Sequence, residues 1–284
     1  GKGKVPWHSK DGKSTRPGIL AWRGSILAYR DRRGRTIKVI PTPHPAATFP
    51  GRDPGLEPIC KRDWSRIATE CETRDLSLPV RTHLISPTLS DLDFLVKICE
   101  AAREDDVLVM DIENPREKDG SAPIVCVGFS LTNDLSVTIP TVKSYWGKQL
   151  DTVWETIRYL CSLPVHKGAW NNFHEQYWLW AEREIAIENL WWDGMYMHHV
   201  LDPSAPHSLA YCASVDTREP YWKDEAKDPD EARKYTSNMS AFYTYNGKDC
   251  CVTRELTNVY YHRLLDERRT TSAGDTTALD FYLQ

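Results

Sequence analysis

A short apolar stretch that ends in two carboxylates constrains this chain more than any other feature. Residues 107–110, Val-Leu-Val-Met, are apolar and partly β-branched, which predicts a buried central strand. Because side chains alternate across a strand, the following Asp111 and Glu113 are expected to point to the same side. Carboxylates this close repel each other unless a divalent cation lies between them. The pattern therefore indicates either a metal site or a strand end with two solvated acids.

Composition and cysteine usage narrow the class of protein. The 284 residues allow one large domain or two smaller ones, and 40% apolar content is enough for a packed core. No run approaches the length of a membrane span, and the polar start lacks the apolar stretch of a signal peptide, so we expect a cytoplasmic protein without a membrane partner. The eight cysteines are scattered without a CxxC pair, so we expect reduced, mostly buried thiols.

The net charge of −4 conceals two parts of opposite charge. Residues 1–61 carry 13 Lys and Arg against 4 Asp and Glu, and the remainder of the chain is correspondingly acidic. A basic block attracts a phosphate backbone, although a solvated basic face has the same composition. Within this block, Arg23 and Lys38 are predicted to contact nucleic acid. Two short strands around a polar turn are expected at residues 23–35.

A proline-rich loop follows the basic strands. Residues 37–40 favour a strand that runs into Pro-Thr-Pro-His-Pro at 41–45, where the prolines restrict the backbone around His44. On composition alone, this proline-rich loop is the point where the chain leaves a domain. The stretch also resembles the C-terminal part of uracil-DNA glycosylases, which carry a PT-x-HP-(S/A) loop, and the resemblance implies that His44 contacts uracil or DNA. The family's water-activating motif and uracil-stacking aromatic do not precede it, so residues 1–76 are predicted to bind DNA without releasing uracil.

The rest of the chain predicts a second, larger unit. We expect a linker at 77–82, an α/β domain at 83–270 and a tail at 271–284. The predicted fold class is α/β, with a mixed sheet flanked by helices. The expected elements are a helix capped by Ser90, a strand at 107–113, a hairpin with strands at 124–131 and 135–139, a helix at 150–161 and a strand at 165–168.

Two further groups of polar residues follow strands or begin helices. Asn171 or Asn172 can cap a helix whose first turn carries Glu175, which places a third carboxylate at the carboxyl end of a strand, where open α/β sheets bind ligands. Tyr245 and Asp249 are four residues apart and share one face of the apolar-periodic helix expected there, if that helix has already begun at Tyr245. Taken singly, these are ordinary features: a helix cap and a surface pair.

Taken together, these motifs resemble the DEDDy 3′–5′ exonucleases of the ribonuclease H-like superfamily, most closely the proofreading domain of family A DNA polymerases. The matching motifs are Asp-x-Glu at 111–113, Asn-x-x-x-acid at 171–175 and Tyr-x-x-x-Asp at 245–249. The sequence departs from the family at one position, because Glu175 stands where Asp is usual and His174 separates it from the preceding phenylalanine.

The resemblance implies a set of ligands and roles. Two Mg²⁺ or Mn²⁺ ions would be the cofactors, bridged by Asp111. Glu113 and Asp249 would hold the ion on the nucleophile side, and Glu175 would hold the other ion through water. Tyr245 would orient the attacking water.

We therefore predict a metal-dependent exonuclease that hydrolyses the 3′ end of single-stranded or mismatched DNA, with Asn171 among the nucleic-acid contacts. A glycosylase-like front joined to such a domain resembles the N-terminal portion of certain bacteriophage-type family A polymerases. The expected partner is a DNA polymerase domain, on the same longer chain or a separate subunit, in the host cytoplasm for a phage protein. Two alternatives stay open: a ribonuclease D-type enzyme that trims RNA, and a non-catalytic DNA-binding or polymerase-docking module.

Overall fold

The computed structural model describes residues 18–49, 53, 55–103, 105–115, 121–224, 238–271 and 274–283. The chain forms two compact units. The first contains residues up to Leu78 together with Ala213–Tyr221, and the second contains Pro79–Cys212 and Trp222–Gln284. The sequence analysis does not anticipate that the chain returns to the first unit at residues 213–221.

The first unit is built on a β-hairpin and one long helix. Strand β1 (Leu27–Arg30) pairs antiparallel with β2 (Thr36–Val39). β2 nearly coincides with the strand predicted at 37–40, whereas the strands predicted within 23–35 are displaced. Asp31 Oδ1 accepts hydrogen bonds from the backbone amides of Arg33 and Arg35 and so fixes a turn between β1 and β2. The remaining elements of the unit are α1 (Ile19–Trp22), the 3₁₀ turn η1 (Pro45–Thr48) and α2 (Leu56–Cys71).

Arginine side chains hold residues 213–221 within the first unit. Arg23 forms a buried ion pair with Asp63 and donates a 2.9 Å hydrogen bond from Nη1 to Ser214 Oγ. Arg66 Nη1 donates to the carbonyl oxygens of Ser214 and Val215 at 2.7 and 3.0 Å. Charged donors therefore satisfy backbone carbonyls of the returning segment.

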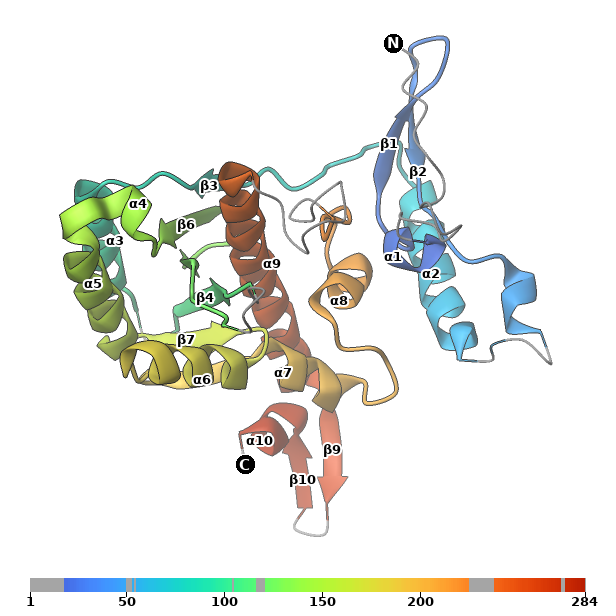
Figure 1. Ribbon diagram of the computed structural model, residues 1–284. Coiled ribbons are helices and arrows are strands. Elements are labelled where there is room, and N and C mark those ends of the chain that lie inside the picture. The colour runs from blue at the N-terminus through green and yellow to red at the C-terminus, as the bar shows by residue number, and fades with distance from the viewer. Residues whose placement is uncertain are drawn as a thin grey trace. The chain divides into compact units, whose positions relative to one another are not determined.

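A six-stranded mixed sheet forms the centre of the second unit (Figure 1). The order is β3-β6-β5-β4-β7-β8, with β5 antiparallel to both of its neighbours and the other pairs parallel. The predicted α/β fold with a mixed sheet flanked by helices is confirmed. The strands are β3 (Thr82–Leu84), β4 (Val107–Glu113), β5 (Cys126–Ser130), β6 (Leu135–Pro140), β7 (His166–Ala169) and β8 (Leu190–Asp193).

Helices cover both faces of this sheet. The main core joins apolar residues of α3 and α5 to one face, which includes Val127 and Phe129 of β5. Cys126 alternates to the opposite face and packs with Phe242 and Tyr243 of α9. The helices of this unit and of the connection to the first are α3 (Leu89–Glu100), α4 (Lys143–Trp146), the 3₁₀ turn η2 (Gly147–Gln149), α5 (Leu150–Ser162), α6 (Asn172–Arg183), α7 (Gly194–Leu201), α8 (Leu209–Asp216) and α9 (Met239–Asp266).

The cap of α3 differs from the prediction. Thr88, rather than Ser90, precedes the helix, and its hydroxyl accepts from the backbone amide of Asp91. The Asp91 carboxylate accepts in turn from the backbone amide of Thr88, which completes a capping box. The reciprocal pair satisfies two backbone donors, whereas Ser90 alone would satisfy one.

Two glycines allow α9 to lie unusually close to the sheet. A Cβ atom on Gly128 of β5 would lie 2.6 Å from Cys250 Sγ and would also overlap Asn246 Oδ1. A Cβ on Gly247 of α9 would lie 2.6 Å from Ser136 Oγ of β6. Because both positions lack side chains, α9 can carry its polar residues directly over the end of β4.

The prediction of a tail at 271–284 is wrong. Strands β9 (Arg268–Thr271) and β10 (Gly274–Thr277) pair antiparallel, and α10 (Ala278–Tyr282) follows. The Tyr282 hydroxyl donates to the carbonyl of Trp191 at 2.6 Å and accepts from the amide of Asp193 at 2.8 Å. The short, polar hairpin conceals this packing from a composition-based analysis.

The cysteine prediction is confirmed: all eight are free, and only Cys71 is exposed. None of the helices in the described ranges combines the length and the apolarity that crossing a membrane requires.

Gly128→Ala should destabilise the protein by about 1–3 kcal/mol, because the new methyl group forces α9 away from the sheet. Urea unfolding measures the change. Gly18→Ala is the control and should be nearly neutral, since nothing lies within 4 Å of a Cβ there. Equal stability of the two variants would show that the close approach of α9 is not needed.

Candidate active site: an acidic centre on β4 and α9

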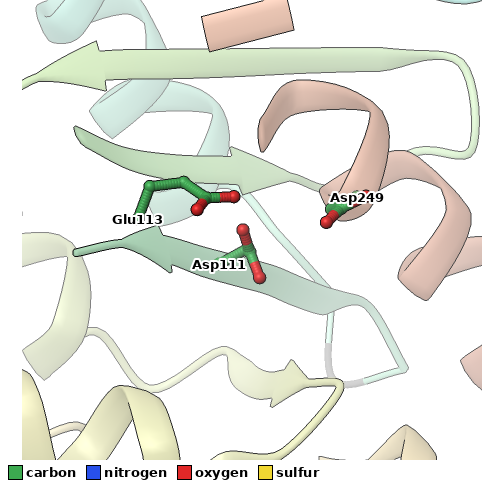
Figure 2. Close-up of side chains that lie close together, drawn as sticks. All are labelled: Asp111, Glu113 and Asp249. Carbon is green, nitrogen blue, oxygen red and sulfur yellow. The ribbon is translucent and has the colours of Figure 1, made fainter. Parts of the chain in front are cut away.

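Three of the predicted ligands converge. Asp111 and Glu113 lie at the end of β4, and Asp249 faces them from α9 (Figure 2). One carboxylate oxygen from each lies within 4.8 Å of the others. Burial, together with the negative charge of Asp249, raises the pKa of Asp111 to about 8. Burial and the charge of Asp111 likewise raise the pKa of Glu113 well above its usual range. The centre therefore concentrates negative charge in a poorly solvated place.

Asn246 fixes the orientation of Asp111, a role that the sequence analysis missed. Its side chain is fully buried, and Nδ2 donates to Asp111 Oδ2 at 2.7 Å and to the Asp111 carbonyl at 3.1 Å. Its Oδ1 accepts from Thr138 Oγ1 at 3.1 Å. Asn246 lies three residues before Asp249 on α9, so helical periodicity places the two on the same face of the helix. This spacing could have identified Asn246 from the sequence.

Glu175 supplies a fourth acid from α6. Its side chain is 3% exposed, and within the described part of the chain Oε2 has no hydrogen-bond partner. Burial and the charge of Asp111 raise the pKa of Glu175 well above its usual range. Glu175 thus lies close enough to act electrostatically on the centre, although it is not one of the three acids that lie within 4.8 Å of one another.

The start of α6 is held by Asp193 rather than by an asparagine side chain. Asn171 is the N-cap residue, but its side chain makes no capping hydrogen bond. Asp193 Oδ2 accepts from the backbone amide of Asn172, and its Oδ1 accepts from the amide of Tyr196 at the start of α7. One carboxylate therefore ties the first turns of two helices together and so places Glu175.

Both oxygens of Asp249 have partners that the sequence analysis missed. Trp222 Nε1 donates to Oδ1 at 2.6 Å, and Lys223 Nζ donates to Oδ2 at 2.6 Å. Lys223 Nζ also donates to the hydroxyl of Tyr245 at 3.0 Å. Burial, followed by the charge of Asp249, raises the pKa of Tyr245, so the phenol stays protonated. Trp222 and Lys223 belong to no recognised motif, and nothing local marks them.

The donor set fits a divalent cation. Mg²⁺ and Mn²⁺ prefer hard oxygen ligands, and here three carboxylates converge while a fourth acid keeps an unpartnered buried oxygen. Such a cluster is costly without positive charge, because buried carboxylates repel each other. The predicted divalent-cation cofactor is consistent with these residues.

The predicted nucleic-acid contacts in the first unit require correction. Arg23 is 3% exposed and is committed to Asp63, and Lys38 Nζ donates to the carboxylate of Glu70 at 2.7 Å. Both basic groups hold the fold together and are not available to a phosphate. His44 is exposed, and its Nδ1 accepts from the amide of Ala46, so it serves as the cap of η1.

The chain is similar to solved structures of nucleases. It is 17% identical to the catalytic core of RRP6 from Trypanosoma brucei, over 89% of this chain and 65% of that one, with a TM-score of 0.47. It is 12% identical to Escherichia coli RNase D, an exoribonuclease involved in structured RNA processing, over 64% and 46% of the chains, with a TM-score of 0.45. For the EXD2 exonuclease domain the identity is 14%, the coverage 64% and 91%, and the TM-score 0.34.

The sequence comparisons add no family. No protein-family model matches the chain, and no curated protein matches it. The chain spans just under two thirds of the RRP6 core and under half of E. coli RNase D. None of the three structures is described as a polymerase or a uracil-DNA glycosylase.

Metal-free protein should lose stability as the pH rises from about 4 to about 8. The pKa of Asp111 is raised from 3.8 to about 8 in the folded state, so the unfolded chain releases this proton first and deprotonation favours unfolding. Asp111→Asn should flatten this dependence, measured as urea unfolding against pH in chelator. Asp151→Asn, at an exposed position of α5, is the matched control. A slope unchanged by Asp111→Asn would contradict the assigned burial.

Proposed function

We propose that this chain is a metal-dependent 3′–5′ exonuclease that removes nucleotides from an unpaired 3′ end. One observation supports the proposal above all others: Asp111, Glu113 and Asp249 converge within 4.8 Å, with Tyr245 one helical turn before Asp249. Converging carboxylates of this kind hold the cations that hydrolyse phosphodiesters.

The residues of the centre divide the work. Asp111, Glu113 and Asp249 would hold a divalent cation, and the buried carboxylate of Glu175 would attract a second one. When bound, such a pair activates water and stabilises the charge on the attacking and leaving oxygens. Tyr245, kept protonated by its surroundings, orients the attacking water by hydrogen bonding. The water oxygen bonds to phosphorus, the terminal phosphodiester breaks, and the 3′ oxygen of the shortened strand leaves with a proton.

DNA is the proposed substrate, with proofreading for a family A polymerase as the role. Support comes from the order and spacing of the three motifs and from the glycosylase-like loop around His44. The polymerase domain would lie on a longer chain or a separate subunit. Trimming of RNA, as by ribonuclease D, uses the same acids and tyrosine, so a direct comparison of substrates separates the two.

The first unit is proposed to hold the strand without releasing uracil. Since Arg23 and Lys38 are internal, the basic groups that face solvent at the β1–β2 turn are the candidates to contact phosphates. These exposed residues are Arg30, Arg32, Arg33 and Arg35. Their loss should weaken binding and reduce its salt dependence.

Asp111→Asn should abolish nuclease activity, because it removes one of the three carboxylates that would hold the divalent cation. Since about 1.4 kcal/mol corresponds to a tenfold change in rate, the loss of several kcal/mol predicts a fall of at least about 10³-fold. The assay follows 3′-labelled single-stranded DNA and a matched RNA oligonucleotide with Mn²⁺, Mg²⁺ or chelator. Faster release from DNA favours proofreading, and faster release from RNA favours trimming. No metal-dependent release from either would favour the non-catalytic module.

Glu175→Gln should lower activity most at low Mg²⁺, because a neutral side chain attracts the second ion less strongly. Rates measured over a range of Mg²⁺ concentrations test this. Glu182→Gln is the control from the far end of α6. Rates unaffected by Glu175→Gln at every concentration would show that Glu175 does not serve the metals.

A further inference from the structure

Lys223 contacts two residues of the acidic centre, Asp249 and Tyr245. Its ammonium lies 2.6 Å from Asp249 Oδ2 and 3.0 Å from the Tyr245 hydroxyl. It also lies 4.8 Å from the centroid of the Tyr245 ring. The lysine side chain is 20% exposed, and that of Asp249 is 6% exposed. A positive charge on the protein itself is therefore inserted between an acid and the tyrosine of the proposed active site.

These contacts place a hydrogen-bond donor on each carboxylate oxygen of Asp249. Because Trp222 donates to Oδ1 and Lys223 to Oδ2, neither oxygen is left without a donor. A divalent cation bound at Oδ2 would lie next to the ammonium, and two positive charges at that distance repel strongly in a poorly solvated site. Lys223 and the cation therefore exclude each other from Asp249.

The contact with Tyr245 has a second consequence. Its hydroxyl accepts a hydrogen bond from the ammonium, which occupies the oxygen that would orient the attacking water. When the Lys223 ammonium moves away, the carboxylate of Asp249 and the hydroxyl of Tyr245 both lose their contact with it. One movement therefore makes both groups available for metal binding and for orienting water.

We propose that Lys223 is the resident counter-ion of the acidic centre, which holds Asp249 and Tyr245 in the metal-free protein and is displaced when a divalent cation binds. This inference rests on the proposed function and adds to it a built-in control of metal loading. Lys223 is a positioning residue in this account. Metal affinity is set partly by the strength of its ion pair with Asp249.

Lys223 can leave Asp249 without a change in the backbone. A lysine carries its ammonium on a flexible four-carbon stem, so rotation about the side-chain bonds is enough to move the charge away from the carboxylate.

Binding of Mn²⁺ alone, without nucleic acid, tests the inference. The electron paramagnetic resonance signal of free Mn²⁺ measures affinity for wild type, Lys223→Met and Lys223→Arg. Lys223→Met should bind Mn²⁺ about tenfold more tightly, equivalent to about 1.4 kcal/mol. Lys223→Arg retains the charge and should bind close to the wild-type affinity.

The variant Lys248→Met tests whether tighter Mn²⁺ binding comes from removing the competing contact with Asp249 or only from removing a positive charge. Lys248 neighbours Asp249 in sequence, and its charge acts on His83, whose pKa it helps to lower. This control removes one positive charge from α9 without removing the contact with Asp249, so it should change affinity much less than Lys223→Met does. Equal gains in both variants would overturn the inference.

Labelling of wild-type protein gives a readout that needs no variant to fold. Reductive methylation followed by mass spectrometry should modify Lys223 faster with saturating Mn²⁺ than in chelator, while exposed Lys148 reacts equally in both. Unchanged or slower modification of Lys223 would overturn displacement. If Mn²⁺ binds but Lys223→Met is no tighter, only this inference fails. If Mn²⁺ binds no form of the protein, the proposed function fails with it.

Discussion

Electrostatic repulsion among three closely spaced carboxylates is the constraint around which the second unit is organised. Asp111, Glu113 and Asp249 lie within 4.8 Å of one another; Asp249 is buried and the other two are half-buried, so water screens their charges poorly. The helix α9 approaches the sheet closely at Gly128 and Gly247. That approach brings the opposing acid, Asp249, and the donor Asn246 to the end of β4. Asn246, Trp222 and Lys223 each donate to a carboxylate of the cluster.

Much of this arrangement was predictable, because it follows from local pattern. β4 covers the residues predicted for it, since an apolar run before two alternating acids has one reasonable reading. The helix that carries Glu175 begins at the predicted asparagines, whereas the helix that carries Asp249 begins at Met239, well before its apolar periodicity. Other features depend on contacts distant in sequence. Lys223 reaches Asp249 across 26 residues, and no local pattern encodes that pairing. Residues 271–284 were misjudged because their hairpin is short and polar.

The first unit shows why the net charge of a segment does not identify which of its basic residues can contact a phosphate. The basic block predicted a phosphate-binding surface, yet Arg23 and Lys38 are paired with Asp63 and Glu70. Such buried pairs fix geometry, and removing one partner leaves an uncompensated charge. Counting charges cannot separate these residues from the exposed arginines at the β1–β2 turn. Only burial and hydrogen bonding make that distinction.

A crystal structure with bound Mn²⁺, located by anomalous scattering, would test the central claim most directly. We expect a Mn²⁺ peak between Asp111, Glu113 and Asp249, with the Lys223 ammonium moved away from Asp249. An anomalous map of Mn²⁺-saturated crystals with no peak among these three carboxylates would contradict it.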